Sequence, residues 1–416
     1  MKFTFTFFVA LFFAIGLQAQ SHRNCGTTHY MDNLIQKDPS LEQKMMIPES
    51  VVREWAKKNA AYKTGVVTIP VVVHVLYNNS TQNISDAQIQ SQIDVLNEDY
   101  RRMNSDTNNT PLEFDTVSAD IEIEFCFAHQ TPTGAWTNGV TRTQVTKTSY
   151  DLNVNDAKFS SKGGVDAWDT KRYLNLWVVP KIMDGNQSGI LGYAQFPGGP
   201  SATDGVVIGY NYFGTTGTVS YPYNGGRTAT HEIGHWFGLL HIWGDDGGSC
   251  SGTDHVDDTP NQADYNDGCP VYPHPSCSNN SDMFMNYMDY TDDRCMNAFT
   301  EGQKVRMLYY LNNYRSTIMT SNKCQVVSME EHILASDLKI YPNPATNLLN
   351  ISFGSNVDEE INIVLYNAMG QQLYSKSYKN FGTNLRVDIN DFATGIYYLQ
   401  IRGKDFSINR KIEIIR

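Results

Sequence analysis

The amino-acid sequence predicts an α+β domain followed by a small all-β domain. Within residues 68–210, short runs rich in β-branched residues surround a segment with a helical period. A second helical segment with three histidines follows, and then a long stretch of loops rich in Cys and Asp. From residue 338 onward, short strand patterns alternate with turn residues, which indicates a separate β-sandwich.

Length and charge limit the classes of function. The chain has 416 residues, enough for two or three domains of about 150 residues each. Hydrophobic residues make up 41% of it and charged residues only 18%, which is typical of a globular protein. The formal net charge is −12 and no Lys/Arg cluster is present. The composition therefore argues against nucleic acid and anionic membranes as partners.

The N-terminus carries the pattern of an export signal. Met1 and Lys2 precede an apolar run over residues 3–17, and cleavage is expected after Ala19. A membrane anchor is the alternative interpretation, but the run is short for a membrane span. We therefore expect a signal peptide over residues 1–19, a secreted or cell-surface protein, and oxidised cysteines.

A polar pro-segment is expected over residues 20–60. It ends in an amphipathic patch in which Val51, Val52 and Trp55 recur at helical spacing. The remaining predicted boundaries are 61–325 for the α+β domain, 326–337 for a linker and 338–416 for the all-β domain.

Each element of the α+β domain has a local signal. Residues 69–76 are predicted to be a buried strand because β-branched residues dominate them. Ser85 is the expected N-cap of a helix over residues 86–101, and Thr300 caps a helix that ends near residue 314. Residues 242–298 are expected to be loops. Further strands are predicted over residues 121–128, 174–179, 189–196 and 206–210, and a further helix over residues 227–240.

Residues 231–241 carry the pattern of a metal site. His231 and His235 are four residues apart, so a helix places both imidazoles on one face. Glu232 lies beside them, where its carboxylate can take a proton from metal-bound water. Gly238 permits the bend that brings His241 to the same point, because glycine tolerates a positive φ.

Three neutral imidazoles suit Zn²⁺ and leave one coordination position open for water. The competing interpretation is a set of core or surface histidines on an amphipathic helix. It does not account for the added Gly238 and His241. We therefore predict one catalytic zinc ion.

The string His-Glu-Ile-Gly-His-Trp-Phe-Gly-Leu-Leu-His over residues 231–241 resembles the zinc motif of the metzincin metallopeptidases, above all that of the pappalysin family. Met288, within Tyr-Met-Asp-Tyr, is similar to the Met-turn of this family. The resemblance covers residues 66–324. It implies a metzincin catalytic domain with a twisted sheet, an active-site helix and a loop-rich lower subdomain, and it makes Met288 an apolar floor beneath the imidazoles.

The resemblance also implies roles for individual residues. Glu232 is the general base and later the acid for the leaving amine. Tyr290 donates a hydrogen bond to the oxyanion, with an ordinary turn aromatic as the alternative. Residues 189–196 are similar to the edge strand that receives substrate as an added antiparallel strand. The implied zinc ligands are His231, His235 and His241.

Four of the seven cysteines lie in the loop-rich stretch, and the residues alone leave all three pairings of these four open. Cys126 and Cys324 can form a further pair, although nothing in the sequence demands it. The family resemblance implies the bonds Cys250–Cys277 and Cys269–Cys295.

Oxygen ligands gather in the same stretch. Residues 254–260 place several carboxylates and a hydroxyl in one turn, which suits Ca²⁺, and the calcium loop of the family lies here too. A solvated acidic turn is the alternative. The predicted calcium ligands are Asp254, Asp257 and Thr259.

The pro-segment offers two candidates for a latency switch. The Cys25 thiolate, within Arg-Asn-Cys-Gly, can occupy the open zinc position and displace water. The alternatives are Asp32, since related enzymes use a carboxylate, and the absence of any switch. Several basic residues lie between Arg53 and Lys63, where the activation cleavage is expected.

The last part of the chain resembles the C-terminal sorting domain of type IX secretion. The resemblance rests on an ordered series of motifs that begins with Tyr-Pro-Asn-Pro. A carbohydrate-binding or adhesion β-sandwich is the alternative. The motifs occupy residues 338–344, 366–371, 395–399 and 411–412.

These signals together predict a secreted, zinc-dependent endopeptidase that is made as a latent zymogen. Its expected partners are protein or peptide substrates and, through the tail, the secretion machinery. The alternative is a non-enzymatic surface adhesion protein with a structural zinc site, against which Glu232 argues because a structural site needs no base. Arg or Lys is expected after the scissile bond, because a pocket wall with acidic side chains favours a basic residue. Arg294 lies among these acids and is expected to neutralise one of them. The acids are Asp289, Asp292 and Asp293.

Overall fold

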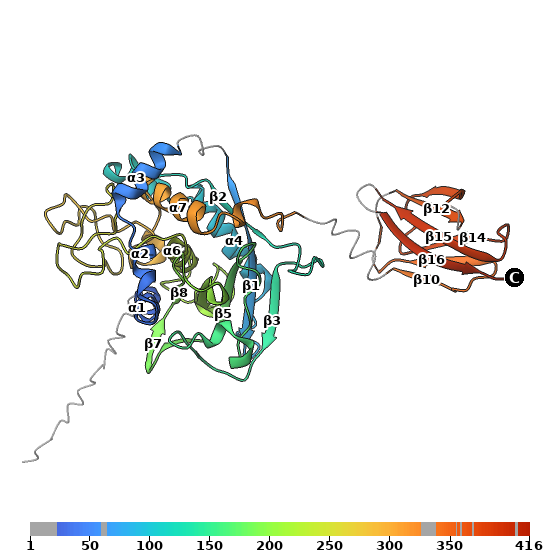
Figure 1. Ribbon diagram of the computed structural model, residues 1–416, viewed down its shortest axis with the longest axis horizontal. Coiled ribbons are helices and arrows are strands. Elements are labelled where there is room, and N and C mark those ends of the chain that lie inside the picture. Colours follow the sequence, from blue (N-terminus) through green and yellow to red (C-terminus); the bar gives the residue numbers. More distant parts are fainter. Residues whose placement is uncertain are drawn as a thin grey trace, which may run out of the picture.

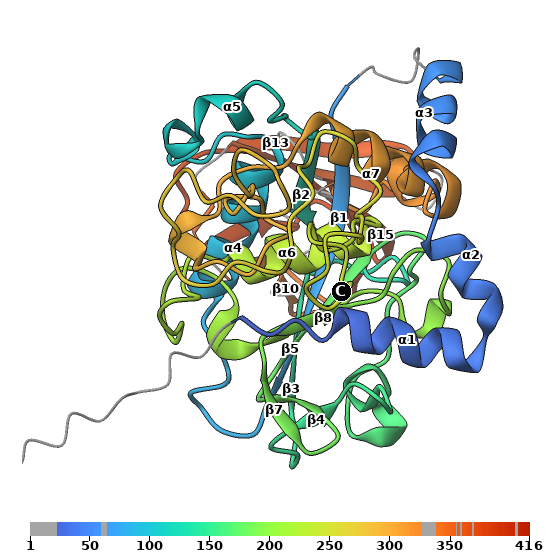
Figure 2. The same cartoon turned by 90° about the vertical axis from the view of Figure 1, so that its left-hand side faces the viewer.

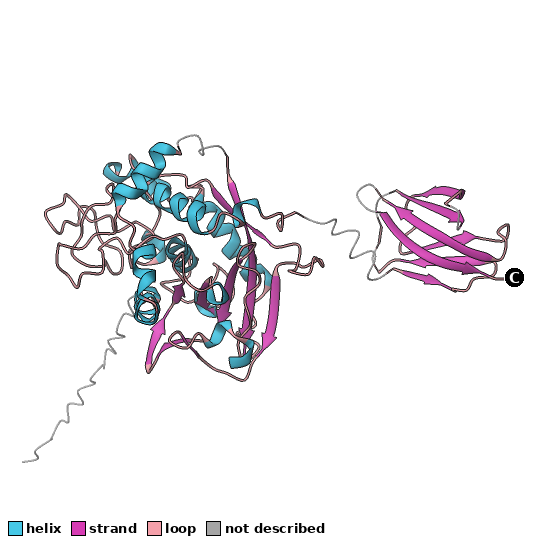
Figure 3. Cartoon of the chain, in the orientation of Figure 1, coloured by secondary structure: helices cyan, strands magenta, loops and turns pink. Residues whose placement is uncertain are grey.

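The computed structural model describes residues 23–59, 65–325 and 338–416, apart from residues 355, 358–359, 368–369 and 404–406. The predicted signal peptide and linker lie outside the described residues. The first part contains helices, strands and long loops, and the described residues of the second part form strands and loops (Figure 3). The predicted fold class, an α+β domain followed by an all-β domain, is confirmed.

A mixed sheet forms the centre of the first domain (Figure 1). The strand order is β2-β1-β5-β9-β8, and β3 also pairs with β1. Within this sheet β8 runs antiparallel to β9 and lies at an edge. An edge strand keeps unpaired N–H and C=O groups that can receive another chain. The strands are β1 (Val67–Tyr77), β2 (Ile123–Phe127), β3 (Val140–Gln144), β5 (Leu174–Val179), β8 (Gly192–Ala194) and β9 (Val206–Gly209).

The predicted strand over residues 189–196 is divided between two sheets. Its first part belongs to β7 (Gln187–Ile190), which pairs with β6 (Ile182–Asp184). Its second part is β8 of the central sheet. The β6 strand also pairs with β4 (Tyr150–Asp151). The alternating pattern could not reveal this division, because buried residues continue through the break.

Two helices pack together beside the sheet, α4 (Asp86–Tyr100) and α6 (Arg227–Trp236). Ser85 caps α4 as predicted, because its hydroxyl accepts from the Gln88 backbone N–H at 3.1 Å. The helix predicted to reach residue 240 ends four residues earlier. Gly238, at φ +91°, cannot continue it.

Two further helices complete the first domain. The predicted cap of α7 (Glu301–Tyr314) is a full capping box, in which Thr300 and Gln303 satisfy each other's backbone N–H groups. The short α5 (Leu112–Asp115) was not predicted. Residues 242–298 are loops, as expected, apart from one short helical turn at Asp293–Cys295.

The pro-segment contributes three helices that the sequence revealed only in part. The predicted amphipathic patch belongs to the last helix, in which Val52 is fully buried and Trp55 meets the ring of Tyr309 edge-on. The first helix, which was missed, lies beside β8 (Figure 2). These helices are α1 (Thr27–Lys37), α2 (Glu42–Met45) and α3 (Glu49–Lys58).

The second domain consists of two antiparallel sheets that share one apolar core. The smaller sheet has the order β10-β11-β14 and the larger one β13-β12-β15-β16. The helices described in this chain include none that is long and apolar enough to cross a membrane. The strands are β10 (Lys339–Tyr341), β11 (Leu348–Ser352), β12 (Ile361–Asn367), β13 (Gln372–Tyr378), β14 (Asn384–Asp388), β15 (Gly395–Arg402) and β16 (Ser407–Ile414).

Candidate metal centre

Three imidazoles converge at the end of helix α6. The Nε2 atom of His235 lies 3.1 Å from the Nε2 atoms of both His231 and His241. All three side chains are buried. The helix supplies the first two, and the turn at Gly238 returns the chain so that the third reaches the same point. The histidines singled out in the sequence therefore form one cluster.

Hydrogen bonds fix the orientation of each ring. Nδ1 of His231 lies 2.7 Å from the carbonyl oxygen of Tyr287, and Nδ1 of His235 lies 2.8 Å from that of Leu239. Nδ1 of His241 lies 2.8 Å from a carboxylate oxygen of Asp245. Because these partners accept, the Nδ1 atoms carry the protons and the Nε2 lone pairs face one another.

Such a donor set fits a cation. Burial, together with the neighbouring histidines, lowers the pKa of both His231 and His235 well below the usual value. Neutral imidazoles with converging lone pairs are the ligands that Zn²⁺ takes in a catalytic site. The residues present therefore fit zinc, with His231, His235 and His241 as the groups that would hold it.

Two glycines are required by close packing at this point. A Cβ on Gly238 would lie 2.2 Å from the ring of Tyr310, and a Cβ on Gly234 would lie 2.5 Å from the sulfur of Met288. Met288 is fully buried and packs beneath helix α6, and the preceding carbonyl of Tyr287 is the one that orients His231. The bend at Gly238 is observed, and the role of Met288 as a floor beneath the imidazoles stays a prediction.

Glu232 lies between the histidines and the edge strand. A Cβ on Gly192 of β8 would approach the Glu232 Cγ to 2.8 Å, so only glycine lets the strand come this near. Burial raises the pKa of Glu232 to about 7. Its Oε2 accepts a hydrogen bond from the Thr27 hydroxyl at 2.8 Å and lies 3.4 Å from the Cys25 sulfur.

Tyr290 packs against the same cluster. Its ring centroid is 5.0 Å from that of His241 and 5.7 Å from that of His231. Trp243, which sequence reasoning missed, stacks on His241 with the ring centroids 4.3 Å apart and also meets the Tyr290 ring edge-on at 4.7 Å. Burial raises the pKa of the Tyr290 phenol well above its usual value, so the phenol keeps its proton as a donor.

The pro-segment reaches the centre of the site. The Cys25 sulfur and the three imidazole nitrogens all lie within 4.8 Å of one another. Cys25 pairs with Gly192 in the parallel sense, and the Gly26 N–H donates to the Gly192 carbonyl at 2.9 Å. Asp32, the alternative switch, is exposed on helix α1 and does not belong to this cluster.

Thr27 and Arg23 are pro-segment contacts that sequence reasoning missed. The Thr27 hydroxyl accepts from the Ala194 N–H of the edge strand at 2.9 Å. The Arg23 guanidinium is buried, donates to Asp293 at 2.5 Å and lies 4.9 Å from the Tyr223 ring. The sequence analysis singled out the Arg-Asn-Cys-Gly string for its cysteine. Nothing in the sequence indicated that its arginine would pair with Asp293, 270 residues away.

Of the three aspartates assigned to substrate specificity, Asp293 is the one that pairs with a cation of the pro-segment, Arg23. Asp289 is fully buried, and its oxygens accept from the Gln262 and Asn266 side chains and from backbone N–H groups, so it holds the loop together. Asp292 pairs with Arg294, which is the neutralisation expected for one of the acids. The prediction is therefore corrected for Asp289.

The cysteines of the loop region form the bonds Cys250–Cys277 and Cys269–Cys295, the pairs that the resemblance implies. Cys126 and Cys324, whose pairing the sequence did not determine, form a third disulfide bond. Cys25 remains as a free thiol.

Two of the three predicted calcium ligands, Asp254 and Thr259, contact each other. Asp254 is buried and accepts from the Thr259 hydroxyl at 2.8 Å and from the Val256 N–H. Asp257 has a 56% exposed side chain that turns away to pair with Arg53 of helix α3. The calcium site formed by Asp254, Asp257 and Thr259 therefore stays a prediction.

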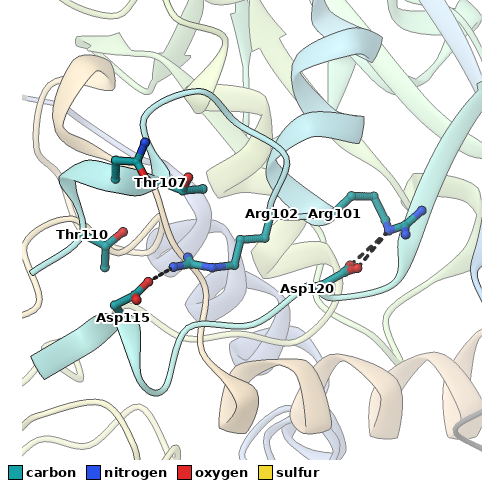
Figure 4. Close-up of a pocket in the computed structure, with 7 residues that line it drawn as sticks. Arg101, Arg102, Thr107, Thr110, Asp115 and Asp120 are labelled. Carbon is teal, nitrogen blue, oxygen red and sulfur yellow. Dashed lines mark hydrogen bonds and ion pairs between the residues drawn. The ribbon is translucent and has the colours of Figure 1, made fainter. Parts of the chain in front are cut away.

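A separate surface pocket contains Arg101 and Arg102 (Figure 4). Arg101 pairs with Asp120 at 3.1 Å and Arg102 pairs with Asp115. Its cations are thus neutralised by the residues that line it, and none of the predicted site residues belongs to it.

Comparisons with known proteins relate both domains to other chains. Residues 159–312 match the peptidase family described as pregnancy-associated plasma protein-A, and residues 339–415 match the secretion system C-terminal sorting domain. An extracellular metalloprotease of Pyricularia oryzae is 31% identical and covers 75% of this chain and 97% of its own length. One from Arthroderma benhamiae is 29% identical and covers 73% and 95%.

Two solved structures are more similar in sequence. Mature mirolysin of Tannerella forsythia in complex with a cleaved peptide is 52% identical, with a TM-score of 0.59, and covers 62% of this chain and 96% of its own. A promirolysin variant of the same organism is 46% identical, with a TM-score of 0.62, and covers 72% and 97%. The likeness thus extends to a mature protein and to its precursor.

The contact between Asp245 and His241 yields a prediction. Replacing Asp245 with Asn removes the carboxylate that orients the ring, so we expect zinc affinity to fall about 10- to 100-fold. Competition with a chromophoric chelator measures this change. Asp267→Asn, at an exposed position of the same loop region, is the charge-matched control, and equal affinity in both variants would contradict the assigned role.

Proposed function

The chain belongs to the pappalysin family of metallopeptidases and ends in a type IX secretion sorting domain. From this premise we propose that Glu232 is the general base of the enzyme. We also propose that the enzyme is made in a latent form and cleaves before Arg or Lys. The chain is a secreted zinc metalloendopeptidase, and its tail directs export. The proposal concerns the residues that carry out the reaction, the choice of substrate and the cause of latency.

One observation carries the mechanism: Glu232 stands between three converging imidazoles and an edge strand that can hold a substrate. When bound by these imidazoles, zinc supplies a Lewis acid that polarises the scissile carbonyl and lowers the pKa of water. Glu232 accepts the proton of the attacking water at its carboxylate and then donates it to the leaving amine. A carboxylate at this place, beside the three imidazoles, can reach both the attacking water and the leaving amine.

The edge strand and Tyr290 position the substrate in this proposal. An extended peptide adds to β8 as an antiparallel strand and bonds to the backbone groups that the pro-segment now uses, such as the N–H of Ala194. The Tyr290 phenol, protonated and beside His231 and His241, is suited to donate a hydrogen bond to the developing oxyanion.

The contacts of the pro-segment support latency through Cys25. Its sulfur lies among the imidazole nitrogens, where the reacting groups must meet. Thr27 adds two contacts, one to the Glu232 carboxylate and one to the Ala194 N–H. The segment runs parallel to β8, opposite to the direction proposed for a substrate, so its own peptide bonds face the site the wrong way round for cleavage.

The buried pair between Arg23 and Asp293 supports the preference for Arg or Lys. Residues that precede Cys25 in the reversed segment occupy the side of the site that receives the residue after the scissile bond. Arg23 fills a pocket there, with Asp293 at one wall and the Tyr223 ring at 4.9 Å. A buried carboxylate needs a cationic partner, which a substrate Arg or Lys supplies once the pro-segment has left.

Activity should depend on Glu232. With Glu232→Ala in the processed protein, we expect the hydrolysis rate of casein to fall at least about 100-fold, because the proton acceptor is lost. Zinc content should stay unchanged, since Glu232 is not among the ligands. A zinc chelator should abolish the wild-type activity. Full activity in the variant would disprove the mechanism.

Specificity should depend on Asp293. In a peptide library analysed by mass spectrometry, we expect wild-type enzyme to enrich Arg and Lys after the cut. Asp293→Asn should reduce this enrichment at least about tenfold, the effect of about 1.4 kcal/mol. Asp292→Asn, one residue away and paired with Arg294, is the matched control. Apolar residues after the wild-type cut would contradict the pocket.

Latency should depend on Cys25. We expect the unprocessed Cys25→Ser zymogen to cleave a short Arg-containing peptide roughly tenfold faster than unprocessed wild type, since the thiol no longer competes for the metal. Asp32→Asn removes the carboxylate of the alternative switch residue, and we expect the zymogen of this variant to cleave the peptide no faster than unprocessed wild type. An active Asp32→Asn zymogen with a silent Cys25→Ser one would reverse the assignment.

A further inference from the structure

A buried lysine lies near the far end of the edge strand. Lys158, at the end of the short helical turn Asp156–Lys158, is fully buried. Its ammonium donates to the Thr203 carbonyl at 2.7 Å. Among the described residues, no carboxylate lies within ion-pair distance of it. Burial lowers the pKa of Lys158 to about 7.

Aromatic rings take the place of a counter-ion. The Lys158 ammonium lies 4.8 Å from the ring of Tyr193, 4.9 Å from that of Tyr30 and 5.4 Å from that of Trp177. Cations are stabilised over such faces when water is excluded. Tyr193 and Trp177 belong to the catalytic domain, whereas Tyr30 belongs to helix α1 of the pro-segment.

Removal of the pro-segment therefore leaves this site incomplete. The Tyr30 hydroxyl donates to the Gln195 Oε1 at 3.1 Å, and this contact is lost together with the ring. Helix α1 also takes away apolar side chains that pack around Tyr30, among them Met31 and Leu34. What stays behind is an apolar recess next to β8 that has a cation, two ring faces and an amide oxygen.

The register of the edge strand locates the recess relative to the scissile bond. Cys25, at the centre of the metal site, pairs with Gly192. Gln195 is three residues further along, about 10 Å at the rise of an extended strand. Helix α1 lies along this part of the domain (Figure 2). Since Arg23 marks the side after the scissile bond, the recess lies on the side before it.

We propose that in the processed enzyme Lys158, Tyr193 and Gln195 form a subsite for an aromatic side chain, tyrosine above all, two or three residues before the scissile bond. The inference rests on the proposed function, because it assumes a substrate strand along β8. The ring takes the place of Tyr30 over the ammonium, and its hydroxyl donates to Gln195. Trp177 closes the recess from within.

The test uses processed enzyme and peptides that share an Arg after the scissile bond. The peptides carry Tyr, Leu, Glu or Ala at the second or the third position before it. We expect the Tyr peptide at one of these positions to exceed its Leu counterpart in kcat/KM by about 3- to 30-fold, the range of a desolvated cation–π contact.

Lys158→Met keeps the aliphatic stem and should bring the Tyr to Leu ratio to about one, whereas Lys158→Arg should retain the preference. Enrichment of Arg after the cut should stay unchanged in both variants. If Lys158→Met does not fold, the kcat/KM values of the wild-type enzyme for the Tyr, Leu, Glu and Ala peptides are sufficient to test the subsite.

Equal cleavage of all peptides by wild type would overturn the subsite and leave the proposed function standing. A preference for Glu would overturn the aromatic occupant in favour of an acidic one. Cleavage of none of the peptides would overturn the proposed function and this inference with it.

Discussion

The convergence of three imidazole Nε2 atoms is the constraint on which the rest of this site depends. Neighbours only 3.1 Å apart, each with its lone pair turned inward, repel one another unless a cation lies between them. Every nearby element holds that arrangement. The helix sets the spacing of two rings, Gly238 returns the chain for the third, and the carboxylate of Asp245 and two backbone carbonyls fix the rotations.

The same demand explains the chain after the metal motif. The turn that contains Met288 must lie directly against the helix, and Gly234 leaves room for it. The loops that lead into this turn contain few regular elements to stabilise them. Two disulfide bonds and the buried carboxylate of Asp289, which accepts from several loop groups, supply what a sheet or helix would otherwise provide.

The pro-segment lies along β8 at the metal site, in the direction opposite to that proposed for a substrate. Its Cys25 thiol lies among the three imidazoles, its Arg23 donates to Asp293, and its Thr27 hydroxyl donates to Glu232. Under the proposed function, each contact fills a place that a substrate group would take. The proposal therefore assigns latency and specificity to the same surface of the catalytic domain.

By itself the sequence determined what is local: the zinc motif, the caps at Ser85 and Thr300, the strand and helix periods, and the existence of a pro-segment. These follow from residue chemistry and from spacings of a few residues. Only the tertiary structure decided that Arg23 meets Asp293, 270 residues away, that Asp289 turns inward, and that Tyr30 covers Lys158. Such contacts depend on how distant segments pack, and no local period encodes them.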